Sequence, residues 1–310
     1  MAACCAPQRP EAVQPADGSV VSITPGPAPP LRLTAIAACD FLMGNDGPDA
    51  LPGDGEGPAR RVSLSAFSIS ATAVTNREFA DFVRTTRYVT QAESSGFSFV
   101  FFLQASTDVR ASSRQVATGM PWWLAVEGAS WQRPEGPGTH IYDRLDHPAV
   151  HISWNDAQTY CVWAGVRLPT EAEWECAARG GIEGRRFPWG EDLMRDDVPC
   201  CNIWRGSFPN EPADGWQPGA ISAAGGPPNG FGLFNTCGNV WEWCADWYHA
   251  DYHFATGSKD PFFADATGYR SMRGGSFLCH DSYCNRYRVA ARHSNTPSST
   301  ASNIGFRVAR

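Results

Sequence analysis

Glycine and proline interrupt this chain so often that long regular segments are not expected. Its 310 residues include 30 Gly, 24 Pro and 12 Trp. Glycine and proline break regular structure, whereas tryptophan packs irregular loops against a core. Short alternating runs at 61–70 and 304–310 indicate strands. The sequence therefore predicts an α+β fold with few helices, short antiparallel strands and long loops, which need internal clamps such as bound cations.

Three segments carry start and stop signals for helices. Each begins at a Ser or Thr that can cap the first turn, and apolar residues follow at helical spacing. The first begins with a capping box of Thr75 and Glu78. The other two end at glycine, which favours the left-handed conformation of a helix end. The predicted helices span 75–83, 153–165 and 170–180.

The composition indicates one globular domain preceded by a tail. Hydrophobic residues make up 43% of the chain and charged residues 18%, so the chain can bury a core. Its length suits one large domain or two small ones. Residues 1–30 are rich in Pro, Ala, Gly and Gln, which predicts a disordered tail. Residues 31–310 are expected to form a single domain.

Charge and hydropathy argue against two classes of partner. The net charge is −7, whereas nucleic-acid-binding proteins carry a basic footprint. No window approaches the roughly 20 consecutive apolar residues of a membrane helix. The start of the chain has neither the basic nor the apolar part of a secretory signal. We therefore expect a cytoplasmic protein in a reducing compartment that binds neither nucleic acid nor membrane.

One pair of cysteines stands in a polar and charged stretch, residues 274–288. The chain has 11 cysteines, an odd number that does not suit a secreted disulfide framework. Gly residues at the start of the stretch favour an irregular turn, which can fold Cys279 and Cys284 toward each other. We expect Arg286 and Arg288 to share a strand face with Cys284, where their charge would lower its pKa and favour the thiolate.

Spacing alone leaves several interpretations of this pair open. A loop-closing disulfide or two inert thiols is the ordinary interpretation, and spacing by itself favours it. Two thiolates would suit a low-coordinate soft ion such as Cu(I) better than tetrahedral zinc. Zinc would need two more ligands, and the chain contains no C-x-x-C motif.

Four segments together resemble formylglycine-generating enzymes, the sulfatase-modifying factor family. The resemblance runs from about Ala37 to the last residue. Its most specific part is the pattern G-G-S-x-x-C-H-x-S-Y-C-x-R-Y-R, which contains the cysteine pair. It implies a single irregular, loop-rich domain of the C-type-lectin-like superfamily. The segments that carry the resemblance are 167–181, 229–248, 273–292 and 295–310.

The resemblance implies a copper-dependent oxidase that acts on other proteins. Cys279 and Cys284 would hold one Cu(I) ion, and O2 would be the second substrate. The target is a cysteine in a C-x-P-x-R segment of an unfolded sulfatase, which would become formylglycine in a post-translational modification. A monomer is expected. The remaining pocket residues implied are Ser276, Trp241, Tyr283 and Asn303.

The resemblance also implies two calcium sites built from side-chain and carbonyl oxygens, the ligands that Ca2+ prefers. Ordinary turn chemistry is the alternative for such Asn- and Gly-rich loops. The first site would use Asn235, Gly238, Val240 and Glu242. The second would use Asn202, Ile203, Asp214 and Trp216.

Secreted relatives carry two structural disulfides that this chain cannot form. Cys161 matches one half-cystine, but the partner position is Val308. The other pair falls on Ala178 and Val289. Both departures agree with the expected reducing compartment.

Alternative functions are a non-haem iron sulfoxide synthase, a non-catalytic paralogue that binds sulfatases, and a carbohydrate-binding module. The first would need an added helical domain with a three-His site, which this chain lacks, and the cysteine pair argues against the second. The third rests on fold analogy alone. Residues 5–9, C-A-P-Q-R, match the C-x-P-x-R pattern themselves, which suggests self-modification or autoinhibition as a hypothesis.

Overall fold

The three helices expected from the sequence are present in the computed structural model of the chain. They are α1 (Asn76–Thr86), α4 (Trp154–Ala164) and α5 (Glu171–Arg179). At each start a Ser or Thr side chain accepts the N–H of the third helical residue, and an acidic side chain completes the capping box. Gly165 and Gly180 end the second and third helices in the left-handed conformation. The predicted helix signals are confirmed.

The structure describes residues 6–9, 26, 31–51, 53–113, 116–196 and 198–310. Most of the tail predicted at residues 1–30 lies outside this set, so its disorder stays a prediction. Residues 6–9 are described, and three of these four residues are buried against the domain. Within the described residues, no helix is long and apolar enough to cross a membrane.

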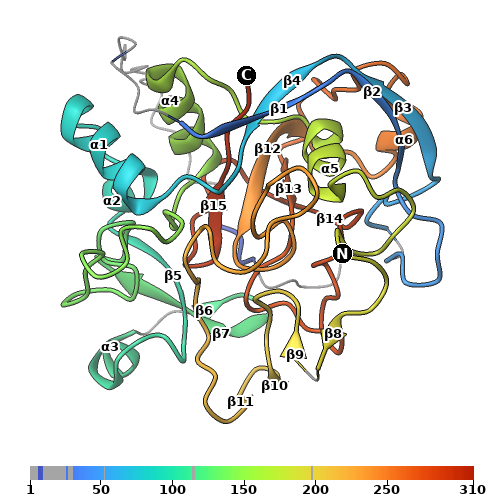
Figure 1. Cartoon of the computed structure of the whole chain (residues 1–310). Coiled ribbons are helices and arrows are strands. Elements are labelled where there is room, and N and C mark those ends of the chain that lie inside the picture. Colours follow the sequence, from blue (N-terminus) through green and yellow to red (C-terminus); the bar gives the residue numbers. More distant parts are fainter. Residues whose placement is uncertain (1–5, 10–25, 27–30, 52, 114–115, 197) are drawn as a thin grey trace.

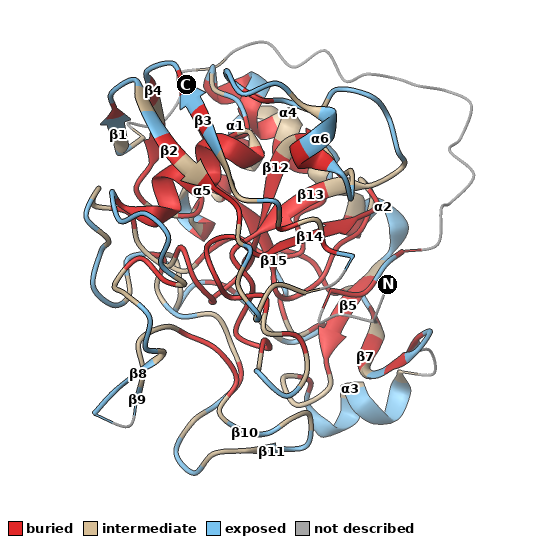
Figure 2. Ribbon diagram, turned by 90° about the vertical axis from the view of Figure 1, so that its right-hand side faces the viewer, coloured by how far each residue is buried: buried red, intermediate tan, exposed pale blue. Residues whose placement is uncertain are grey.

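Three short helices were not expected from the sequence. The first of them begins with a capping box of Thr90 and Glu93, but it is too brief for apolar periodicity to show. The second buries none of its residues and is exposed in Figure 2. These helices are α2 (Gln91–Ser95), α3 (Thr107–Ser112) and α6 (Tyr252–Ala255).

A sheet in the order β14–β13–β12–β15 forms the centre of the molecule (Figure 1). The first two pairings are antiparallel, as expected, but β12 and β15 run parallel. Most strand residues here are buried, as the red strands of Figure 2 show. The sheet's strands are β12 (Trp241–Trp247), β13 (Arg270–Arg273), β14 (Arg292–Asn295) and β15 (Ile304–Phe306).

Smaller antiparallel sheets surround this centre. The strands predicted at 61–70 are confirmed as β3 and β4, which pair with β2 and β1. A separate sheet in the order β5–β7–β6 lies below α1 and α2 in Figure 1. These strands are β1 (Leu33–Ile36), β2 (Cys39–Met43), β3 (Arg60–Leu64), β4 (Phe67–Ser70), β5 (Phe97–Phe101), β6 (Val116–Ala117) and β7 (Met120–Glu127). Two hairpins complete the set with β8 (Met194–Arg195), β9 (Val198–Pro199), β10 (Gly206–Ser207) and β11 (Glu211–Pro212).

Buried ion pairs clamp α5 to the central sheet. Arg292 of β14 binds Glu171 through two hydrogen bonds of 2.7 and 2.8 Å. Arg273 of β13 and Arg179 both pair with Glu175. Burial alone would raise the pKa of Glu175, but these two arginines outweigh it and lower the pKa to about 2. Part of the clamping expected of the loops is therefore done by side-chain charges.

Candidate active site

Two buried polar contacts join the ends of the central strands. The side chain of Asn303 donates from Nδ2 to Ser276 Oγ at 2.9 Å. Its backbone carbonyl accepts the backbone N–H of Trp241 at 2.8 Å. All three residues are completely buried. Trp241 begins β12, Ser276 follows β13 and Asn303 precedes β15. The sheet therefore brings together three of the predicted pocket residues.

Cys279 is fixed to the same frame. Its N–H donates to the Ser276 carbonyl at 2.9 Å, and the Ser276 N–H points to Cys279 Sγ at 3.3 Å. A donor aimed at sulfur stabilises the thiolate over the thiol. Gly275, just before Ser276, allows the backbone of Arg286 to approach closely: its φ is +74°, and a Cβ there would lie 2.8 Å from the carbonyl oxygen of Arg286.

Cys284 follows Cys279 across one tight turn. The His280 carbonyl accepts N–H groups from Tyr283 at 3.0 Å, Cys284 at 2.9 Å and Asn285 at 3.1 Å. Cys279 is completely buried, and Cys284 is 3% exposed. The irregular turn expected from the sequence is therefore present between the two cysteines.

The strand expected from Cys284 to Arg288 is wrong. The backbone there is irregular, and β14 begins only at Arg292. The local sequence alternates as a strand does, but the arginines instead reach a distant loop. Arg286 binds Asp54 at 2.5 and 2.9 Å, and Arg288 binds Glu56 at 2.6 and 2.7 Å.

Each of the two arginines is paired with a buried carboxylate. Asp54 and Glu56 are buried together with the arginines that they bind. A bidentate carboxylate offsets most of the field of a guanidinium at a neighbouring thiol. The Ser276 N–H is a group that favours a thiolate at Cys279. The effect of Arg286 and Arg288 on the pKa of Cys284 stays a prediction.

Tyr283 belongs to an aromatic wall that the sequence did not reveal. Its ring stacks on Phe208, with centroids 4.6 Å apart, and meets Trp122 edge-on at 5.3 Å. Phe208 also contacts Trp204 at 5.2 Å. No local pattern in the sequence marked Phe208 as a neighbour of Tyr283. The wall forms because β7 and the β10–β11 hairpin approach the cysteine turn.

Two side chains of the first predicted calcium group form hydrogen bonds with other residues of the chain. Glu242 accepts hydrogen bonds from Arg307 at 2.5 and 2.8 Å and from Trp174 at 2.7 Å. Asn235 donates its amide hydrogens to the carbonyls of Ser222 and Ala223. Gly238 and Val240 lie between them on the same segment. Arg307 offsets the charge of Glu242, while the amide oxygen of Asn235 and the backbone carbonyls are ligands of the type that Ca2+ takes, so calcium at this site stays a prediction.

The second predicted calcium group lies on two segments of the chain. Asn202 and Ile203 lie on one buried segment, while Asp214 is exposed on a nearby turn. The two segments are held together by the rings of Trp204 and Trp216, which are 5.3 Å apart. An amide oxygen, a carboxylate and backbone carbonyls are oxygen ligands of the type that Ca2+ takes.

The cysteine pair fits a soft ion by its donor chemistry. Two sulfur donors in a buried setting suit a low-coordinate ion such as Cu(I). Among the described residues, no group of three or more His, Cys, Asp or Glu side chains is placed to hold a metal. A two-sulfur site, or a site of amide and carbonyl oxygens, does not need such a group.

Cys161, the cysteine expected to lack its disulfide partner, is an inert buried thiol. It forms no disulfide with any described cysteine and is 1% exposed. Burial raises its pKa far above the usual value. The position expected to pair with it, Val308, is also buried.

His151 and His253 are buried in the domain. His151 binds Ser98 Oγ at 2.7 Å and the Pro134 carbonyl at 2.8 Å, and burial lowers its pKa to about 4. His147, by contrast, is partly exposed.

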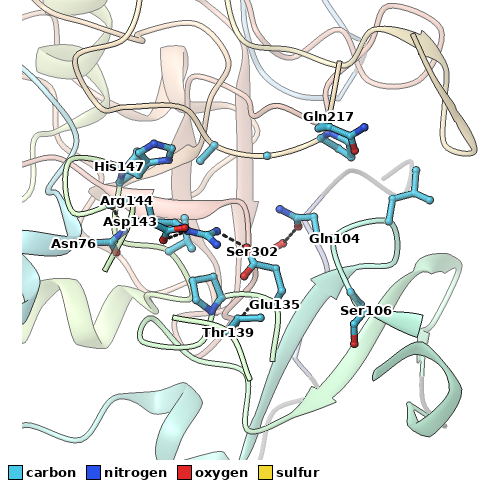
Figure 3. A pocket seen from close by; sticks show the side chains of 18 residues that line it. Asn76, Gln104, Ser106, Glu135, Thr139, Asp143, Arg144, His147, Gln217 and Ser302 are labelled. Carbon is cyan, nitrogen blue, oxygen red and sulfur yellow. Dashed lines mark hydrogen bonds and ion pairs between the residues drawn. The ribbon is translucent and has the colours of Figure 1, made fainter. Parts of the chain in front are cut away.

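A polar cavity of about 570 Å3 opens beside this site (Figure 3). Ser302 donates to Gln104 at 2.6 Å on one part of its lining, and Arg144 pairs with Glu135 at 2.5 Å on another. Ser302 precedes Asn303, but none of the six predicted catalytic residues lines the cavity. It is therefore a separate feature from the cysteine site.

An irregular α+β domain with a buried cysteine pair beside Ser276, Asn303 and Trp241 defines the class of protein. The sequence matches the family described as Sulfatase-modifying factor enzyme 1-like domain over residues 27–310. The chain therefore belongs to the sulfatase-modifying factor family, as the resemblance suggested.

Its relatives include active and inactive members. A formylglycine-generating enzyme of Thermomonospora curvata is 52% identical over 282 residues, or 89% of this chain and 92% of the relative. A protein of Bos taurus named inactive C-alpha-formylglycine-generating enzyme 2 is 43% identical, with 87% of this chain and 84% of the relative covered. The structure of PvdO from Pseudomonas aeruginosa is similar with a TM-score of 0.65 and 25% identity, covering 90% of this chain and 93% of that protein.

Proposed function

We propose that this protein is a copper-dependent oxidase that converts a cysteine of an unfolded sulfatase to formylglycine. The target cysteine lies in a C-x-P-x-R segment, and O2 is the oxidant. The observation that carries the proposal is the buried turn from Cys279 to Cys284, whose first sulfur receives the Ser276 N–H. Relatives named formylglycine-generating enzymes, such as that of Thermomonospora curvata, support it.

The residues of this chain would hold the cysteine sulfurs ready for a metal. The Ser276 N–H favours a thiolate at Cys279, and Asn303 fixes Ser276 through its hydroxyl. Tyr283, stacked on Phe208, would restrict water at the partly exposed side of the turn. Cu(I) bound by Cys279 and Cys284 would supply the one-electron chemistry that the reaction of a thiol with O2 requires.

The overall conversion balances with a thiol as reductant. The peptidyl group CH2–SH and O2, together with two electrons and two protons, give the aldehyde CHO, hydrogen sulfide and water. The C–S bond and one C–H bond of the substrate are broken, and a C=O bond is formed. Two molecules of an external thiol supply the electrons and protons by forming a disulfide.

Mass spectrometry of a C-x-P-x-R peptide tests this proposal. The peptide is incubated with protein loaded with Cu(I), in the presence of O2 and a thiol. Conversion would make the peptide about 18 Da lighter, as exchange of CH2–SH for CHO requires. Omission of copper or of O2 should each stop the reaction. Conversion that continues without either one would contradict the proposed chemistry.

A non-catalytic sulfatase-binding protein is the second candidate, because one relative is named inactive. Family membership alone does not separate the two functions. The buried turn that joins Cys279 to Cys284 favours the oxidase, since a purely binding protein has no need of two sulfurs in such a setting. Peptide binding without conversion, under conditions that load copper, would favour the second candidate.

We place calcium at the second predicted site as a structural ion. Asn202, Ile203, Asp214 and Trp216 would supply its oxygens, and the packing of Trp204 on Trp216 supports their approach. A monomer in the cytoplasm remains our proposal for the state and location of the protein.

A further inference from the structure

The N-terminal string that matches the substrate pattern is bound to the domain. Figure 1 shows the described part, residues 6–9, in dark blue near the central sheet. Asn295 at the end of β14 donates from Nδ2 to the Pro7 carbonyl at 3.0 Å. The Arg9 N–H donates to Ser299 Oγ at 3.0 Å. The segment is therefore held by its backbone along the chain that follows β14.

The side chain of Arg9 is buried among residues that satisfy only some of its hydrogen-bond donors. Its Nη2 donates to the Phe97 carbonyl at 2.5 Å and to Thr300 Oγ1 at 3.0 Å. The guanidinium carbon lies 4.2 Å from the centre of the Phe97 ring, in a cation–π contact. The residue is only 5% exposed. These surroundings thus select for the shape, donors and charge of an arginine.

The same surroundings leave Arg9 incompletely satisfied. Its Nε and Nη1 are buried without a hydrogen-bond partner among the described residues. Burial lowers the pKa of Arg9 to about 10, and the charge of Asp156 only partly offsets this. Buried donors without partners weaken binding. The contact is therefore suited to an occupant that can leave.

Both described residues that the pattern C-x-P-x-R fixes are buried. Pro7 and Arg9, which the pattern fixes, are buried, whereas Gln8, at a variable position, is exposed. Ala6 at the other variable position is small and also buried. Cys5, the residue that the pattern would place at the reaction, lies outside the described residues.

The N-terminal segment contacts residues that shortly precede Asn303 of the candidate active site. Its partners Asn295, Ser299 and Thr300 all precede Asn303, which binds Ser276 and Trp241. One continuous stretch, from β14 to the start of β15, therefore contacts both the N-terminal segment and, through Asn303, the residue Ser276 of the cysteine site.

We propose that residues 6–9 are an intramolecular occupant of the surface that receives the sulfatase segment, and that a substrate must displace them. The inference rests on the proposed function for the identity of the substrate, and it involves no covalent step. A tethered ligand acts at an effective concentration of order 1 mM. If the same segment bound with a dissociation constant of about 0.1 mM, it would weaken the binding of a competing peptide about tenfold.

Binding of a fluorescent peptide to the full-length chain tests this occupancy without any catalysis. The probe carries residues 1–12 with Cys4→Ser and Cys5→Ser, which prevents oxidation. Fluorescence anisotropy is measured with the wild type, Arg9→Glu, Arg9→Ala and the matched control Gln8→Ala. The two Arg9 variants should bind the probe about tenfold more tightly than the wild type, because their own segment no longer competes. Gln8→Ala should match the wild type, and thermal melting checks that each variant is folded.

Three results would overturn the inference. One is equal affinity in all four proteins, and another is tighter binding with Gln8→Ala as large as that with Arg9→Glu. The third is equal binding of a probe whose own arginine is replaced by alanine. A C-x-P-x-R peptide of unrelated flanking sequence should displace the probe from Arg9→Glu. Displacement without oxidation of that peptide would support the occupied surface while contradicting the proposed oxidase.

Discussion

Asn303 donates a hydrogen bond to Ser276 at 2.9 Å across 27 positions of the chain, with both residues fully buried. Ser276 in turn places its backbone N–H on the sulfur of Cys279 at 3.3 Å. The two contacts connect the start of β15 to the cysteine turn. Asn303 therefore acts on the sulfur through Ser276, as a positioning residue.

Replacement of Asn303 should lower peptide turnover strongly, whereas its effect on the free energy of unfolding should be smaller. Asn303→Ala leaves the Ser276 hydroxyl without its donor, and we expect a loss of turnover of about 10- to 100-fold. Ser276→Ala should have a similar effect, and the double variant should be little worse than either single one, because both act through one contact. Turnover and thermal unfolding are measured for all three. Fully additive losses would contradict the coupling.

The buried ion pair of Glu56 with Arg288 should contribute far more to the free energy of unfolding than an ion pair at the surface. Glu56→Gln leaves Arg288 buried without its full countercharge, which should lower the free energy of unfolding by about 3–5 kcal/mol. Glu183→Gln removes the exposed partner of Arg61 and should cost at most about 1 kcal/mol. Chemical denaturation measures both. Equal effects would mean that the loop containing Glu56 does not hold the segment after Cys284.

Acid should destabilise the protein in part through His253. Burial lowers the pKa of this imidazole from its ordinary 6.5 to about 4, and neither ring nitrogen has a hydrogen-bond partner among the described residues. A depressed pKa means that the unfolded chain binds the proton first, so stability is lost as the pH falls from about 6.5 toward 4. The loss from this group is roughly 1–3 kcal/mol.

His253→Phe should therefore flatten the stability profile over this pH range. The variant keeps an aromatic ring of similar shape but cannot take up a proton. Urea unfolding at pH 5 and pH 7.5 gives the comparison, with the exposed His140 replaced by Phe as a control that should leave the slope unchanged. If the free energy of unfolding of His253→Phe falls with pH as steeply as that of the wild type, His253 is not the group responsible.

Calcium should stabilise the protein through Asp214. Addition of Ca2+ after treatment with a chelator is expected to raise the melting temperature by several degrees, in line with about 1–3 kcal/mol of binding linkage. Asp214→Asn should remove most of this increase, whereas Asp265→Asn, at another exposed aspartate, should keep it. If Ca2+ still raises the melting temperature of Asp214→Asn by the same amount, the ion binds at another site.

Local signals in the sequence predicted local structure well. The caps at Ser153 and Gly165 fix both ends of α4, since a capping box and a left-handed glycine involve only neighbouring residues. The glycines before Ser276 likewise predicted the irregular turn between the cysteines. The motif carried by this stretch was sufficient to identify the family.

Contacts between distant residues could not be predicted from the sequence. Arg288 and Glu56 are 232 positions apart, and the strand expected through Arg288 failed because this partner draws the arginine toward a distant loop. The parallel pairing of β12 with β15 and the stacking of Phe208 on Tyr283 have the same origin. Each depends on how loops cross in space, which no local pattern records.

The assignment of Cys279 and Cys284 as the copper ligands is tested most directly by substitution in the peptide conversion assay. The wild type, Cys284→Ser and the matched control Cys161→Ser are loaded with Cu(I) and given the same C-x-P-x-R peptide, O2 and thiol. The account predicts a product about 18 Da lighter from the wild type and from Cys161→Ser, and none above background from folded Cys284→Ser. Equal conversion by Cys284→Ser would contradict it.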